Sequence, residues 1–256
     1  MNHLSIKINN GRTVRLNAPS SWNELNSTHL LTWSRICLQT VPLQTAKYLA
    51  VAGIYQIPTE ILESLKEPHL LQISHTLAFL FNKNRLSKWL IKSFKYQTKR
   101  YYGPDDHLAN LSIFEYRCTE LCYQSYLKNQ DRKSLILLTA TLYRPKRKGT
   151  IYDDIREDLS DYEVNRRVKR FKKLHPEILY AILINYEGCR NLLMHQYAEV
   201  FSTKIRDDHA NVSDLQYLIE SLAGAPFGSF SETEKTNLHR FFRYLVKMVQ
   251  TKSSYD

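Results

Sequence analysis

Hydrophobic and polar positions alternate across residues 4–17, on both sides of the dipeptide Asn10-Gly11. Alternation with a period of two is typical of a β-strand, and Asn-Gly favours the tight turn of a β-hairpin. The pattern therefore predicts a small hairpin within an arm formed by residues 1–20. Because two strands alone are marginally stable, this arm is expected to pack on another part of the protein or on a partner.

From residue 21 onward the hydrophobic residues recur every three or four positions, which is typical of amphipathic α-helices. Residues 70–90 form the longest stretch of this kind in the first half of the chain. A Ser followed three positions later by Glu has the form of a capping box and predicts a helix start. This pattern occurs at Ser21, Ser112 and Ser231.

The clearest helix is expected directly after Ser112. Its predicted buried stripe consists of Leu111, Phe114, Cys118, Leu121, Cys122 and Ser125. A second helix ends before Pro145 and is expected to pair with the first as a helical hairpin. Further helices are predicted to begin at Pro176, near Asn211 and at Ser231.

These patterns predict a mainly α fold, a multi-helix globular bundle of about eight to ten helices with a small N-terminal β-hairpin. Strands do not alternate with helices, which argues against a doubly wound sheet. The helical domain is expected to cover residues 21–256. A boundary between two subdomains is expected near residues 145–160, where the sequence changes from basic to acidic.

The chain has 256 residues, 43% of them hydrophobic, and this is enough to form a core without metals or disulfides. No apolar segment has the length of a membrane span or of a signal peptide, so we expect a protein of the cytoplasm with no membrane partner. The spacing of the cysteines matches no zinc or disulfide pattern, and we interpret them as core residues. They are Cys37, Cys118, Cys122 and Cys189.

The sequence contains no recognisable catalytic or nucleotide-binding motif. Asp105-Asp106-His107 and the similar residues 207–209 are interpreted as helix-boundary residues, because Asp is common at helix caps. We therefore predict a protein that is not an enzyme, with no cofactor, no metal and no small-molecule substrate.

The excess of 36 Lys and Arg over 25 Asp and Glu gives a net charge of +11 and favours an acidic partner, either nucleic acid or an acidic protein. Residues 83–102 carry seven bases and no acid, interleaved with aromatic residues, and residues 144–148 add a second basic group. The candidate contacts are Lys88, Lys92, Lys95, Lys99, Arg100, Arg144, Lys146, Arg147 and Lys148.

Residues 83–102 also allow a second interpretation. Leu86, Leu90 and Phe94 recur at a spacing of four, which predicts an amphipathic helix with its lysines on a solvated face. Under this interpretation the lysines contact no partner. The periodicity favours this helix over a nucleic-acid surface.

Several short segments along the chain resemble an uncharacterised family encoded in tailed-phage and prophage genomes. They are residues 20–25, 102–111, 114–116, 138–145, 154–156 with 166–167, 185–190 leading to 200–201, and 225–228. None of them is a catalytic signature. Where a typical member has Pro-Glu-Ser-Trp, this chain has Pro19-Ser20-Ser21-Trp22, so the resemblance is weaker at the start.

The resemblance implies a protein of the phage tail-morphogenesis module, found in the cytoplasm of the bacterial host or in the virion. Two roles are open: a tail assembly chaperone that holds the tape-measure or tail-tube protein before polymerisation, and a minor virion component. In both, the partner is a phage tail protein. The alternative function is a basic nucleic-acid-binding protein that uses residues 83–102.

Overall fold

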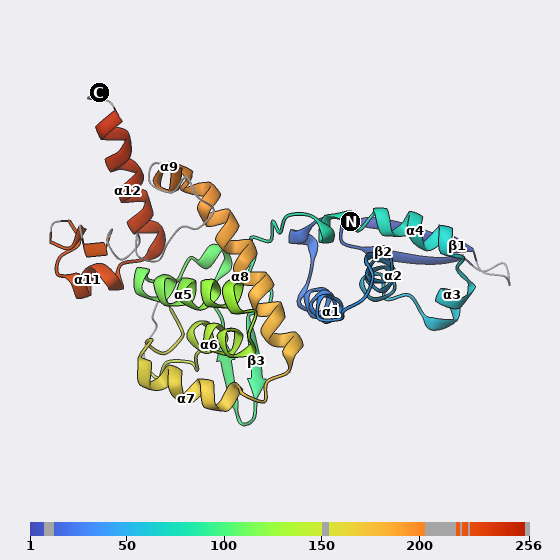
Figure 1. Cartoon of the computed structure of the whole chain (residues 1–256), viewed down its shortest axis with the longest axis horizontal. Coiled ribbons are helices and arrows are strands. Elements are labelled where there is room, and N and C mark those ends of the chain that lie inside the picture. The colour runs from blue at the N-terminus through green and yellow to red at the C-terminus, as the bar shows by residue number, and fades with distance from the viewer. Residues whose placement is uncertain (8–12, 150–153, 203–218, 221, 225, 254–256) are drawn as a thin grey trace. The chain divides into compact units, whose positions relative to one another are not determined.

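The computed structural model describes residues 1–7, 13–149, 154–202, 219–220, 222–224 and 226–253, without the side chains of the last two (Figure 1). Eleven α-helices lie within these ranges. The chain begins with an antiparallel hairpin of β1 (Asn2–Lys7) and β2 (Thr13–Ala18). The predicted mainly α fold with an N-terminal hairpin is confirmed. The hairpin turn at Asn10-Gly11 and the helix start expected near Asn211 lie outside the described residues.

The chain divides into two compact units. Unit 1 comprises Met1–Leu90 and His175–Gly188, and unit 2 comprises Ile91–Leu174 and Cys189–Asp256. The subdomain boundary expected near residues 145–160 is therefore wrong, because that segment lies inside unit 2, where Arg156 pairs with Glu115. The N-terminal hairpin belongs to unit 1, and it is not a separate arm.

Unit 1 packs short helices around an apolar centre. These are η1 (Trp22–Glu24), α1 (Ser27–Cys37), α2 (Leu43–Ile54), α3 (Thr59–Ser64), α4 (Glu67–His75) and η2 (Ala78–Phe81). Leu30 of α1 and Val51 of α2 are fully buried, and the two helices pack against each other. The N-terminal hairpin is held in place by Asn2, whose Nδ2 donates to the carbonyl oxygens of Pro19 (3.0 Å) and Thr76 (2.9 Å).

The single helix expected over residues 70–90 is wrong, because α4 ends at His75 and residues 82–92 form a loop. This loop is stabilised by side chains of α8 (Pro176–Gln196) instead of by helical hydrogen bonds. Asn185 accepts from the Leu90 N–H at 2.7 Å and donates to the Lys88 carbonyl oxygen at 2.8 Å. Gly188 permits the close approach, since a Cβ there would lie 2.5 Å from the carbonyl oxygen of Leu86.

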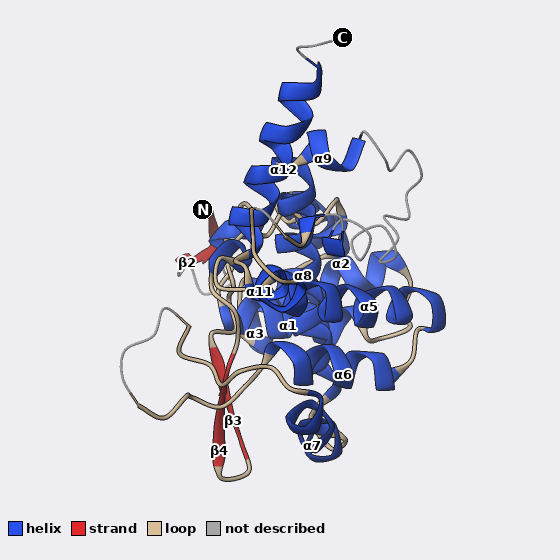
Figure 2. Ribbon diagram, turned by 90° about the vertical axis from the view of Figure 1, so that its left-hand side faces the viewer, coloured by secondary structure: helices blue, strands red, loops and turns tan. Residues whose placement is uncertain are grey.

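Unit 2 contains a second hairpin and the longer helices (Figure 2). Its elements are β3 (Ser93–Tyr96), β4 (Lys99–Tyr102), η3 (Asp106–Leu108), α5 (Ile113–Asn129), α6 (Arg132–Leu142), α7 (Asp161–Phe171), the end of α8, α9 (Ala198–Ser202), α11 (Phe230–Lys235) and α12 (Leu238–Ser253). The helical hairpin of α5 and α6 matches its prediction, as does the start of α8 at Pro176. No helix among the described residues is both long and apolar enough to cross a membrane.

The β3–β4 hairpin replaces the amphipathic helix that the spacing of Leu86, Leu90 and Phe94 predicted, so that prediction is wrong. The physical reason is an aromatic cluster around Phe171 of α7. The ring of Phe94 lies 5.7 Å from the Phe171 ring, and that of Tyr101 lies 4.9 Å from it, edge to face. Phe94 and Tyr101 are direct partners across the strands and share one face of the hairpin.

The predicted buried stripe of α5 is partly wrong. Cys122 is buried, but Leu121 is 51% exposed, and Phe114, Cys118 and Ser125 are only half-buried. The helix instead turns Tyr116, Thr119, Glu120 and Tyr123 inward. Glu120 can be buried because the Arg190 guanidinium of α8 donates to both of its carboxylate oxygens at 2.8–2.9 Å.

Of the three predicted capping boxes, only Ser112 caps the expected helix, by accepting from the Glu115 N–H. Ser21 precedes the short η1 and makes no side-chain cap bond. The box expected at Ser231 is formed two residues earlier, by Ser229 and Glu232. The last predicted helix is therefore two helices, α11 and α12.

Candidate functional site

The basic candidate residues divide into groups with different surroundings. Lys88 is exposed on the loop of unit 1, whereas all the others belong to unit 2. Lys92 is paired with Asp106. Three candidates are exposed on the β3–β4 hairpin, namely Lys95, Lys99 and Arg100. The structure thus brings these three together on one element.

The basic group at residues 144–148 is not a single surface patch. Arg144 is 1% exposed and paired with carboxylates, so the prediction that it contacts a partner is wrong. Arg147 is half-buried and paired with Asp158. Lys146 and Lys148 are exposed.

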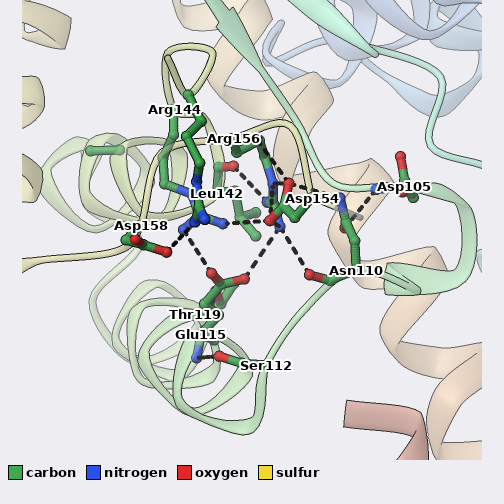
Figure 3. Close-up of polar contacts among 12 residues, drawn as sticks. Asp105, Asn110, Ser112, Glu115, Thr119, Leu142, Arg144, Asp154, Arg156 and Asp158 are labelled. Carbon is green, nitrogen blue, oxygen red and sulfur yellow. Dashed lines mark hydrogen bonds and ion pairs between the residues drawn. The ribbon is translucent and has the colours of Figure 1, made fainter. Parts of the chain in front are cut away.

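Arg144 belongs to a buried ion-pair cluster that we define as Glu115, Arg144, Asp154 and Arg156 (Figure 3). Nη1 of Arg144 lies 2.6 Å from Oε1 of Glu115, and Nη2 of Arg156 lies 3.3 Å from Oε2 of the same carboxylate. Arg156 also holds Asp154 through Nε and Nη2, both at 2.9 Å. Two guanidinium groups thus share two carboxylates, and the cluster is formally neutral.

Local structure brings these four side chains together. Glu115 lies in the first turn of α5, where the positive end of the helix dipole favours a carboxylate. Arg144 follows the end of α6, and its backbone exchanges two hydrogen bonds with that of Tyr102 at 2.8 and 3.1 Å. The Arg156 backbone forms a bridge with that of Lys146, and its Nη1 donates to the carbonyl oxygen of Leu142 at 3.1 Å.

Burial decides the electrostatics of the cluster. Arg144 and Arg156 are each 1% exposed, and desolvation lowers the pKa of Arg144, an effect that the neighbouring Glu115 opposes. A buried charge is tolerated when it is paired and hydrogen-bonded. The four groups are paired with one another, although Nε of Arg144 has no hydrogen-bond partner among the described residues, and the cluster holds the end of α6 and residues 154–156 against the start of α5.

A pocket of about 860 Å³ opens beside this cluster, and we call it the α5–α11 pocket. Its wall is formed by the start of α5, by residues 154–159 and by α11 with its flanks. The apolar part of the wall consists of Ala109, Leu111, Phe114 and Leu159. The charged part consists of Asp105, Glu115, Asp154, Asp158 and Glu234, with Arg147 and Lys235. Carboxylates therefore outnumber cations in the wall of a pocket that belongs to a basic protein.

Contacts between the elements join the parts of the pocket wall. Glu234 of α11 pairs with Arg117 of α5 at 2.8 Å, and both side chains are less than one-fifth exposed. The backbone of Leu238 donates to the carbonyl oxygen of Leu111 at 2.9 Å. Asp105 is the exception among the acids of the wall. It is exposed, and its carboxylate has no partner among the described residues.

The described residues offer little reactive chemistry. Burial raises the pKa of the Cys122 and Cys189 thiols to about 12, so neither is a thiolate at neutral pH. No group of three or more His, Cys, Asp and Glu side chains in the described ranges is placed to hold a metal ion. The carboxylates of the cluster are already engaged by guanidinium groups of the same unit.

Sequence reasoning did not find the cluster, because the charge count treated its arginines as surface residues. A signal was nevertheless present. The segments that carry the phage-family resemblance include residues 114–116, 138–145 and 154–156, and these supply all four members of the cluster. The resemblance thus falls on residues that support the fold of unit 2.

Comparison with known proteins adds no relative: no family model matches the chain, and no curated protein or solved structure is significantly similar to it.

Proposed function

We propose that this chain is a non-catalytic binding protein of the phage tail-morphogenesis module, a tail assembly chaperone or minor virion component that holds a tail protein in the α5–α11 pocket. The observation that carries the proposal is the composition of this pocket wall. It combines apolar side chains with carboxylates, and most of those carboxylates are held by arginines of the same unit. Such a wall suits binding better than bond cleavage.

The chemistry of the wall defines the partner segment. Phe114 and Leu159 offer apolar contact, and Asp105 offers a carboxylate with no partner among the described residues. A partner segment that carries a hydrophobic side chain next to Lys or Arg would contact both the apolar residues and the carboxylate of Asp105. The phage assignment itself rests on the sequence resemblance, and the tape-measure and tail-tube proteins are the partners that it implies.

The test is co-expression of the tagged chain with each protein encoded by the neighbouring tail genes, followed by affinity capture. We expect one tail protein to be retained and to remain soluble only in the presence of this chain. Asp105→Arg is expected to reduce the captured amount at least about tenfold, because it reverses the charge that the partner contacts. Glu63→Arg makes the same charge change at an exposed position of α3 in unit 1 and serves as the control.

Two results would contradict the proposal. If none of the co-expressed tail proteins were captured, the proposal that the partner is a tail protein would be excluded. Equal loss of capture by Asp105→Arg and Glu63→Arg would show that overall charge, and not the pocket, determines binding.

A further inference from the structure

The β3–β4 hairpin, residues 93–102, carries three exposed cations and no acidic residue, and we call it the basic ribbon. Lys95 and Arg100 are direct partners across the two strands and therefore lie on the same face. Like charges placed opposite each other destabilise a strand pair. In the described structure no carboxylate pairs with either residue, although Nη1 of Arg100 donates to the hydroxyl of Ser93 at 3.0 Å.

The other face of the basic ribbon is occupied by its own protein. Phe94, Tyr96 and Tyr101 contact the ring of Phe171 at centroid distances of 5.7, 6.0 and 4.9 Å. Phe94 also lies 4.9 Å from the ring of Tyr143. These rings attach the ribbon to α7 and the end of α6. They are therefore not available for stacking on the bases of a bound strand.

The helix that carries Phe171 adds more cations beside the ribbon. Residues 164–173 contain no acid, and they expose Arg166, Lys169, Lys172 and Lys173. The hydroxyl of Tyr101 accepts from Nη1 of Arg170 at 3.5 Å, which places α7 directly against β4. Two segments about seventy positions apart in the sequence thus form one basic region in unit 2, although Arg166 at its edge is paired with Glu163 at 2.6 Å.

From this arrangement we infer that the basic ribbon and residues 164–173 form a binding surface for the phosphate backbone of nucleic acid. A two-stranded β-ribbon has dimensions that fit the major groove of a duplex. Phe94, Tyr96 and Tyr101 are packed on Phe171, so we expect binding to rest mainly on phosphate contacts and to show no sequence preference. This surface is separate from the α5–α11 pocket, and the inference does not depend on the proposed tail partner.

An acidic protein surface suits this region less well. The centre of a protein interface is typically depleted in charge and rich in aromatic anchors. The basic ribbon and residues 164–173 contribute none of the exposed large hydrophobic side chains of the described structure, and the one next to them, Tyr162 of α7, lies 5.7 Å from the Arg166 guanidinium. A region of closely spaced cations without an apolar anchor is typical of backbone contact with a polyanion.

The test measures fluorescence anisotropy of three labelled 24-mers, duplex DNA, single-stranded DNA and RNA, with the full chain between about 50 and 300 mM KCl. For the wild type we expect the logarithm of the association constant to fall linearly with that of the salt concentration. The variant Lys95→Glu/Arg100→Glu is expected to bind at least about tenfold more weakly, with a salt slope reduced by about 2. Lys99→Glu, at the ribbon turn, is expected to reduce the slope by about 1.

The matched control is Arg240→Glu/Lys247→Glu, which makes the same charge change at exposed positions of α12 in the same unit. It is expected to bind within about threefold of the wild type, since it leaves the local phosphate contacts intact. Circular dichroism verifies that every variant is folded.

Three outcomes would overturn the inference. One is no salt-sensitive binding of any of the three nucleic acids by the wild type. Another is a ribbon variant that is indistinguishable from the α12 control. The third is displacement of the nucleic acid by poly-glutamate at an equal concentration of charge, which would assign the surface to acidic proteins. Loss of tail-protein capture by Asp105→Arg has no bearing on these results.

Discussion

Nη1 of Arg144 lies 2.6 Å from Oε1 of Glu115, although the two residues are separated by almost the whole α5–α6 hairpin. Antiparallel pairing of the two helices explains this, because the start of α5 and the end of α6 lie at the same end of the hairpin. Both side chains are largely shielded, with exposed fractions of 1% and 13%. The pair therefore closes the hairpin at a point where the chain leaves α6.

The first prediction is that Arg144→Met destabilises the protein by about 3 to 5 kcal/mol, because it leaves two largely shielded carboxylates to share the single guanidinium of Arg156. The free energy of unfolding is measured by urea titration. Arg166→Met is the control. It removes the exposed pair with Glu163 on α7, with side chains 45% and 33% exposed, and should change stability by less than about 0.5 kcal/mol. Equal effects of the two substitutions would contradict the buried cluster.

The second prediction concerns Arg167, a buried arginine whose replacement is not expected to lower the stability of the protein. It is 1% exposed, and its Nε donates to the carbonyl oxygen of Ala140 at 2.7 Å. Its Nη1 and Nη2 are buried without a partner among the described residues, and burial lowers its pKa to about 10. Replacement of such a charge by an apolar side chain is often neutral or stabilising.

Arg167→Met is therefore expected to leave the free energy of unfolding unchanged or to raise it by about 1 to 4 kcal/mol. Urea titration beside Arg144→Met provides the comparison, because the wild-type residue is buried to the same extent in both. A loss of more than about 2 kcal/mol would show that Arg167 has a stabilising partner in the folded protein.

The helices could be predicted from the sequence wherever each one buries an apolar stripe against a neighbour, as α6 and α8 do. Prediction failed where a polar residue is buried because its partner is distant. Glu120 is an example, since its partner Arg190 lies 70 positions further along the chain. The helix prediction for residues 82–102 was wrong for the same reason, because distant residues, Asn185 and Phe171, hold this segment in non-helical conformations.

The candidate sites show the same limit in another form. A count of charged residues in the sequence does not distinguish Lys95 from Arg144. In the structure, however, Lys95 is exposed and Arg144 is buried among carboxylates. Only the packing of α5, α6 and residues 154–156 distinguishes them. The acidic character of the α5–α11 pocket was likewise hidden, because its residues come from separate segments of a chain whose net charge is +11.

The third prediction is a loss of stability in acid that depends on Glu24. The backbone N–H of Ser20 donates to its carboxylate at 2.7 Å and, as the largest of several favourable contacts, lowers the pKa from 4.5 to about 2. A carboxyl whose pKa is lower in the folded state stabilises above pH 4.5, and this contribution is lost as the pH falls toward 2. Thermal unfolding of Glu24→Gln should show a smaller decrease of Tm between these pH values than the wild type. Parallel curves would contradict this assignment.

The last prediction tests the interior of unit 2 through its thiols. Cys122 and Cys189 are 5% and 0% exposed, and burial raises their pKa to about 12. Alkylation needs both access and the thiolate, so native protein treated with iodoacetamide at about pH 8 should leave both residues unmodified. Mass spectrometry of tryptic peptides measures the modification, and the same treatment in urea, where both thiols should react, is the control. Rapid modification of Cys189 in the native protein would mean that the second half of α8 is not packed as described. It would also contradict the Arg190–Glu120 pair, which explains the buried face of α5.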